Sequence, residues 1–125
     1  MRNNQAALDL TRAVERKERG GLSLSHALRA IMLDPTIGWY TRGQAARLLT
    51  VAEGASVADK LIRQFFAQTG EIELWETALT MESFGDTRVI APLIPALHDE
   101  NHHRRHAAAR ALGWIGRGAS PAVNA

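Results

Sequence analysis

Four histidines lie close together in the C-terminal part of the chain: His98, His102, His103 and His106. On a helix, His102 and His106 would project from one side, and two imidazoles in this arrangement can bind zinc or nickel. A useful site needs a third donor, for which His98 or Glu100 is the candidate. The cluster lacks a His-Glu-x-x-His motif, and a solvated helix face accounts for it without a ligand. We therefore expect no tightly held metal.

Three tryptophans, Trp39, Trp75 and Trp114, lie off the apolar stripes of their predicted helices. Trp114 follows Arg110 by four residues, which places both on one helix face. An exposed tryptophan beside an arginine is typical of protein interfaces. Packing against a neighbouring element is the alternative, which we favour for Trp75 and leave open for Trp114.

No pattern in the chain indicates catalysis or a cofactor. It has no cysteine, which excludes disulfides, thiolate nucleophiles and Cys-ligated zinc, and it has no glycine-rich phosphate loop. The excess of 15 Lys and Arg over 13 Asp and Glu is too small to favour a nucleic-acid partner. Neither a signal peptide nor an apolar run of about 20 residues is present, so we expect a cytoplasmic protein without a membrane contact.

Apolar residues recur at helical spacing in seven segments separated by turn signals. Ser23 or Ser25 is the candidate N-cap of the second helix, and Asn101 that of the last. Pro92 and Pro95 predict a kink or an irregular start in the sixth helix. The expected helices span about 3–19, 23–33, 37–53, 56–68, 71–84, 89–97 and 101–116.

The same pattern returns along the chain. Ala46, Ala78 and Ala109 are separated by 32 and 31 residues, and Leu49, Met81 and Leu112 show the same two offsets. Self-similarity at a fixed period of this size is the signature of a helical solenoid. We therefore expect an all-α single domain over 1–125, an α-solenoid of stacked hairpins, divided into 1–35, 36–69, 70–98 and a partial repeat at 99–125. Three hairpins and an unpaired last helix would form a right-handed superhelix.

The apolar stripes also predict which side chains form the core. The ten expected core residues are Leu28, Ile31, Leu49, Ile62, Phe66, Met81, Leu93, Leu97, Leu112 and Ile115.

Residues 84–116 resemble the short HEAT-like repeats of the phycobilin lyase type. The resemblance rests on a Gly85-Asp86 turn, an apolar helix over 89–97, a turn with Asp99, and the pattern Arg-x-x-Ala-Ala-x-Ala-Leu-Gly-x-Ile-Gly over 105–116. It implies a HEAT- or armadillo-like fold and a non-catalytic protein-interaction or scaffold module with a protein partner. Two alternatives stay open, a component of a bilin lyase or isomerase system and a nucleic-acid-binding HEAT-like protein that uses Arg104, Arg105, Arg110 and Arg117.

Two arginines, Arg42 and Arg105, fall near the core stripe of their helices, where a charge requires a partner. In repeats of the kind that this chain resembles, the equivalent arginine commonly pairs with the turn aspartate. The resemblance therefore implies structural ion pairs of Arg105 with Asp99 and, by weaker analogy, of Arg42 with Asp34.

After the last apolar stripe, residues 117–123 look like the start of a further repeat that stops early. The end of the array would then be uncovered, and exposed apolar surface of this kind usually marks an interaction site. We expect the end formed by Leu97, Leu112, Trp114 and Ile115 to be covered by a second copy, as a homodimer, or by a partner protein. The expected interaction surface is Trp114, Arg110, His106, Leu112 and Ile115.

Overall fold

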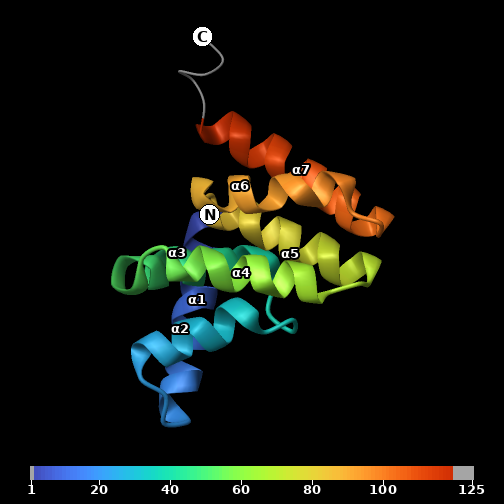
Figure 1. Cartoon of the computed structure of the whole chain (residues 1–125). Coiled ribbons are helices and arrows are strands. Elements are labelled where there is room, and N and C mark those ends of the chain that lie inside the picture. The colour runs from blue at the N-terminus through green and yellow to red at the C-terminus, as the bar shows by residue number, and fades with distance from the viewer. Residues whose placement is uncertain (1, 120–125) are drawn as a thin grey trace.

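The computed structural model describes residues 2–119, with side chains at position 5 and from 8 to 117. This part of the chain is all-α and contains no strand (Figure 1). Seven α-helices and two 3₁₀ segments follow one another: α1 (Arg2–Arg19), α2 (Leu24–Leu33), α3 (Trp39–Glu53), α4 (Ser56–Ala67), α5 (Glu71–Phe84), η1 (Thr87–Val89), α6 (Ile90–Leu93), η2 (Ile94–His98) and α7 (His102–Ala119). The predicted fold class is confirmed, whereas the division into four repeats stays a prediction.

Local capping chemistry explains the helix ends. The Ser23 hydroxyl accepts a hydrogen bond from the His26 amide at 3.4 Å, and Asn101 Oδ1 accepts one from the His103 amide at 2.9 Å. At the other ends, Gly54 and Gly85 have φ values of 62° and 67°, a region that glycine enters at little cost. Both predicted N-caps are confirmed.

The segment 87–98 is a helix broken into three pieces, η1, α6 and η2 (Figure 1). Pro92 and Pro95 each lack a backbone N–H, so a regular α-helix could not run through both positions. The Asp86 carboxylate caps the start by accepting from the Arg88 amide at 2.9 Å. The irregular sixth helix is confirmed.

The last helix runs further than expected. It was expected to end at about residue 116, but α7 continues past Gly113 and Gly116 to Ala119. Glycine inside a helix costs about 1 kcal/mol relative to alanine, which packing on one face can offset. Residues 117–119 thus belong to α7 rather than to a further repeat, and the rest of that expected repeat start, 120–123, lies outside the described residues.

Helices α3, α5 and α7 form one layer, in which α5 lies between the other two (Figure 1). Helices α2 and α4 and the broken segment 87–98 pack against this layer, and α1 packs on α2 and α3. Because α7 contacts α5, α6 and η2, the expectation of an unpaired last helix is wrong. Within residues 2–119, no helix has both the length and the apolar character needed to cross a membrane.

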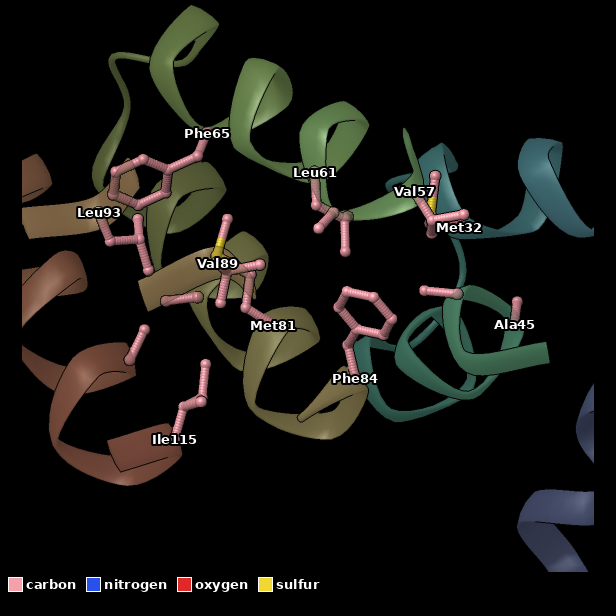
Figure 2. Packing of buried hydrophobic residues seen from close by; sticks show 14 of the residues in the cluster. Met32, Ala45, Val57, Leu61, Phe65, Met81, Phe84, Val89, Leu93 and Ile115 are labelled. Atoms are coloured by element: carbon pink, nitrogen blue, oxygen red, sulfur yellow. The ribbon is translucent and has the colours of Figure 1, made fainter. Parts of the chain in front are cut away.

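The core lies between the layers, where Met81, Val89 and Leu93 meet side chains of α4 and α7 (Figure 2). Six of the ten predicted core residues are buried: Leu28, Ile31, Leu49, Met81, Leu93 and Ile115. Ile62 and Leu112 are only partly buried, and Phe66 and Leu97 are exposed. At these last two sites the preceding residue, Phe65 or Ala96, takes the core position, because a shift of one residue rotates a side chain by about 100° around α4 and by about 120° around the 3₁₀ segment η2.

Helices α3 and α5 approach each other closely at Gly43. A Cβ atom there would lie 2.7 Å from the Phe84 backbone nitrogen, nearer than real Cβ atoms come. Gln44 Nε2 donates a hydrogen bond to the Ser83 carbonyl, and Ser83 Oγ donates one to the Tyr40 carbonyl. The first pair is separated by 39 residues in the sequence and the second by 43. The repeat period would instead place residues 32 apart side by side. Helix α5 is therefore shifted along α3 by roughly two turns.

Gly43→Ala is expected to lower the free energy of unfolding by about 1–3 kcal/mol, because the added methyl group would collide with Ser83 Oγ and Cβ and with the Phe84 backbone nitrogen, which cannot move independently of α5. Gly113→Ala in α7 is the matched control, since no heavy atom lies within 4 Å of its Cβ position. There the gain in helix propensity should raise stability by up to about 1 kcal/mol. Urea denaturation of both variants checks this, and changes of equal sign and size would contradict the close approach.

Candidate functional site

The histidine cluster lies at the start of α7 and in the segment before it. The ring centroids of His102 and His103 are 3.9 Å apart and those of His102 and His106 are 6.1 Å apart. His102 and His106 are exposed, and His98 lies at the end of η2. In the described part of the chain, no three histidine or carboxylate side chains are placed to hold a metal ion.

Metal analysis of the untagged protein is accordingly expected to find no stoichiometric zinc, because two imidazoles without a third protein ligand bind the ion weakly. One tightly held ion per chain, lost in the double variant His102→Ala/His106→Ala, would contradict this prediction.

Arg42 is a buried cation in a structural role. Its side chain is 1% exposed, and Nε donates to the Met32 carbonyl at 3.0 Å and Nη2 to Gln64 Oε1 at 3.3 Å. Gln64 Nε2 in turn donates to the Leu33 carbonyl at 3.3 Å. These carbonyls belong to the last turn of α2, which has no intrahelical donors for them. Arg42 thus closes the end of α2 and joins it to α4.

The implied pair of Arg42 with Asp34 is wrong. The Asp34 carboxylate accepts from the Thr36 hydroxyl at 2.6 Å and from the Thr36 amide at 2.8 Å, and it lies 3.9 Å from Lys17 Nζ. The Thr36 hydroxyl bond is the largest cause that lowers the pKa of Asp34. Burial lowers the pKa of Arg42, and the charges of Glu76 and Asp34 oppose that shift only across space.

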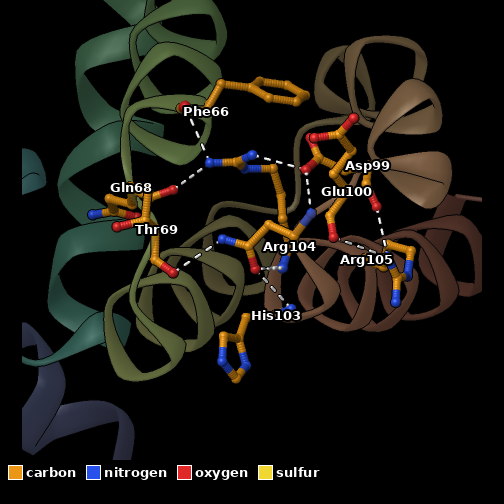
Figure 3. A network of polar contacts seen from close by, with 9 residues as sticks. Phe66, Gln68, Thr69, Asp99, Glu100, His103, Arg104 and Arg105 are labelled. Carbon is orange, nitrogen blue, oxygen red and sulfur yellow. Dashed lines mark hydrogen bonds and ion pairs between the residues drawn. The ribbon is translucent and has the colours of Figure 1, made fainter.

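The expected pair of Arg105 with the Asp99 carboxylate is also wrong, because the neighbouring arginine takes that place (Figure 3). Arg104 Nη1 lies 2.9 Å from Asp99 Oδ1, whereas Arg105 Nη1 donates to the backbone carbonyls of Asp99 and Glu100, at 2.7 and 3.2 Å. The pKa of Asp99 is lowered mainly by the hydrogen bond from the Asn101 amide, with a further contribution from Arg104.

Arg104 also reaches across to the end of α4. Its Nη2 donates to the Gln68 carbonyl at 2.5 Å, and Asn101 Nδ2 donates to the Thr69 carbonyl at 3.1 Å (Figure 3). The Arg104 guanidinium lies 5.9 Å from the centre of the Phe66 ring. This network ties the start of α7 to the loop before α5, so these side chains stabilise the fold and leave little free for a ligand.

Arg110 has a different partner from the one that its spacing suggested. Its guanidinium lies over the Trp75 ring at 4.6 Å, and Nε donates to Glu82 Oε2 at 3.0 Å. Burial raises the pKa of Glu82, and the charge of Arg110 opposes the rise. Trp114 is left 59% exposed. Helix α5 therefore holds Arg110 in place and leaves Trp114 free to contact another molecule.

A groove of about 400 Å³ crosses α3, α5 and α7. We refer to it as the α3–α5–α7 groove. Tryptophan, tyrosine and arginine, which are enriched at protein interfaces, make up more than half of its lining. The lining residues are Trp39, Tyr40, Gln44, Arg47, Leu79, Glu82, Ser83, Arg110 and Trp114.

The shift of α5 along α3 creates this groove. It brings the exposed first turn of α3, with Trp39 and Tyr40, beside the last turns of α5, where Ser83 accepts and donates hydrogen bonds. The rings of Trp39 and Tyr40 meet edge to face with centroids 6.0 Å apart. Trp114 lines the same groove from α7.

A larger cavity of about 590 Å³ lies between α1 and the start of α3. Its charged lining is mixed, with Arg12, Arg16 and Lys17 against Asp9 and Asp34. It contains no aromatic side chain. We regard the smaller groove as the better candidate site because aromatic and arginine side chains converge there.

Only part of the predicted interaction surface lines the α3–α5–α7 groove. Trp114 and Arg110 line it, and His106 is exposed on α7 outside its lining. Leu112 is half-buried and Ile115 is 3% exposed, so the C-terminal end offers less apolar area than expected. A homodimer through this end stays a prediction, which sedimentation at high protein concentration can test.

Sequence reasoning missed the α3 side of the groove, above all Tyr40, Gln44 and Arg47. All three lie away from the Ala45–Leu49 stripe. An aromatic residue and an arginine on the outward face of α3 were therefore the only sequence signal that could have indicated a binding surface there. That signal is weak, since the same face would be solvated if α5 lay in the register of the repeat.

Comparison with known protein families gives a match for the C-terminal part of the chain. A family model described as HEAT repeats matches residues 71–124, which include α5, the broken segment 87–98 and α7. The match is to HEAT repeats in general and does not extend to the phycobilin lyase type. Comparisons with curated proteins and with solved structures give no match.

Proposed function

We propose that this chain, whose residues 71–124 match the model of HEAT repeats, is a non-catalytic interaction module that binds a partner protein in the α3–α5–α7 groove. Proteins with HEAT repeats commonly act as interaction scaffolds and are typically non-catalytic. A fold alone does not define a function, so the proposal rests on the site.

The observation that carries it is the exposure of Trp114 at the edge of a groove that also presents Trp39 and Tyr40. A tryptophan can bury up to about 250 Å² at an interface, and truncation of such an anchor commonly costs about 2 kcal/mol or more of binding energy. In the free protein, Trp114 is 59% exposed, so much of that area remains available to a partner.

The test begins by replacing Trp114 with a photo-crosslinking phenylalanine analogue and identifying the protein that it captures in cells of the source organism. The captured protein is then purified and titrated against the unmodified chain. Trp114→Ala and Trp39→Ala are each expected to weaken binding by about tenfold or more. Val51→Ala is the matched control, because Val51 is 87% exposed on α3 but lies outside the groove.

Two results would contradict the proposal. One is a purified partner whose affinity is unchanged by both tryptophan substitutions. The other is a loss of equal size in Val51→Ala, which would place the interface elsewhere on the α3 surface.

A further inference from the structure

We infer that the segment of the partner protein that occupies the α3–α5–α7 groove is acidic, with a carboxylate bound by Arg47 beside an apolar side chain on the aromatic lining. This inference rests on the proposed function and specifies the chemistry of the partner. The evidence for this inference is the set of charged side chains that line the groove.

Arg47 is the cation in the groove that lacks an intramolecular partner. It is exposed on α3 and, among the described residues, makes no ion pair or side-chain hydrogen bond. An acid does lie nearby, because Asp86 and Arg47 line the same small cavity at the end of α5. The Asp86 carboxylate, however, is bound by the guanidinium of Arg88, with Nη2 at 2.7 Å and Nε at 3.0 Å. Arg47 therefore remains available to an external carboxylate.

The only acid in the lining of the groove is already neutralised. Glu82 accepts from Arg110 Nε at 3.0 Å, and its side chain is 6% exposed. A cationic partner would have to displace Arg110 from both Glu82 and the Trp75 ring before it reached that carboxylate. Two arginines against one paired glutamate leave the groove with one positive charge in excess, which complements an acidic partner.

The aromatic lining is the reason to expect an apolar side chain beside the carboxylate in the partner segment. Tyr40 and Trp39 on one wall and Trp114 on the other present apolar ring surface within reach of Arg47 in the same groove. An acidic residue next to a leucine or phenylalanine can use both features. A nucleic acid is less well matched, because phosphate binding depends on many cations and the whole chain carries a formal charge of only +2.

The experiment measures binding of fluorescein-labelled short peptides to the full chain by anisotropy. One peptide alternates glutamate with leucine and phenylalanine, and its control replaces every glutamate with glutamine. The glutamate peptide is expected to bind about tenfold more tightly than the glutamine peptide, and this preference should shrink as salt is added. Arg47→Gln should abolish the preference. Arg63→Gln, at an exposed arginine on α4 outside the groove, should leave it intact.

Equal affinity for the two peptides, no binding of either, or an equal effect of the two arginine substitutions would overturn the inference. The proposed function would survive such a result if a captured partner still required Trp114. Arg47-dependent binding of a single-stranded oligothymidylate, without binding of the glutamate peptide, would overturn the inference and the proposed function together.

Discussion

Arg42→Ala is expected to lower the free energy of unfolding by about 3 kcal/mol or more. The substitution removes the largest buried side chain of the described part of the chain and leaves a cavity between α2, α3 and α4. It also leaves the Met32 carbonyl and the Gln64 side chain without a donor, and each unsatisfied buried group costs about 1–3 kcal/mol. Urea denaturation followed by far-UV circular dichroism gives the measurement.

Arg105→Ala is the matched control for this prediction, because the sequence repeat assigns Arg105 to the position equivalent to Arg42. The Arg105 side chain is only half-buried, and its bonds are to the carbonyls of Asp99 and Glu100 in the turn before α7, so its loss should cost about 1 kcal/mol. Losses of similar size in the two variants would mean that burial does not distinguish the two arginines.

Phe65→Ala is expected to cost about 3–5 kcal/mol, whereas Phe66→Ala should cost about 1 kcal/mol. Phe65 is 0% exposed and points into the core near Leu93 (Figure 2). Phe66 is 38% exposed, and its ring contacts Phe65 edge to face and the Arg104 guanidinium. Both residues are phenylalanines at adjacent positions, so the difference between their losses of stability reports which face of α4 points into the core.

Chemical denaturation of the two phenylalanine variants under identical conditions decides this point. The reverse order of stability would support the sequence-based core, in which Phe66 faces inward. It would also mean that α4 is rotated by about 100° relative to the structure described.

Most of the helix bounds follow from local sequence. The start of α2 at Ser23 or Ser25 and the start of α7 at Asn101 were predicted from capping chemistry, and the structure has Ser23 and Asn101 at these positions. Pro92 and Pro95 likewise predicted the broken segment. The end expected for α7 at about residue 116 came three residues too early, because an internal glycine such as Gly116 weakens a helix without ending it.

The candidate site was predicted only in part. The four-residue spacing of Trp114 and Arg110 suggested an interface pair, with packing of Trp114 left open as the alternative, and both residues line the groove. Arg110, however, contacts Trp75 and Glu82, and the opposite wall comes from Trp39 and Tyr40 on a helix more than 60 residues earlier in the chain. Spacing within one helix carries no information about which outward residues of another helix lie across from it.

By itself, the sequence determined the all-α class and nearly all helix bounds, because these depend on hydrogen bonds and apolar spacing within about one to five turns of chain. Only the tertiary structure decided which of Arg104 and Arg105 binds Asp99 and where Arg42 finds its acceptors. It also decided how far α5 slides along α3, since the missing side chain of Gly43 lets the backbones meet at that point. The groove exists because of that contact, and contacts between helices are set by the shapes of both surfaces together rather than by either sequence pattern alone.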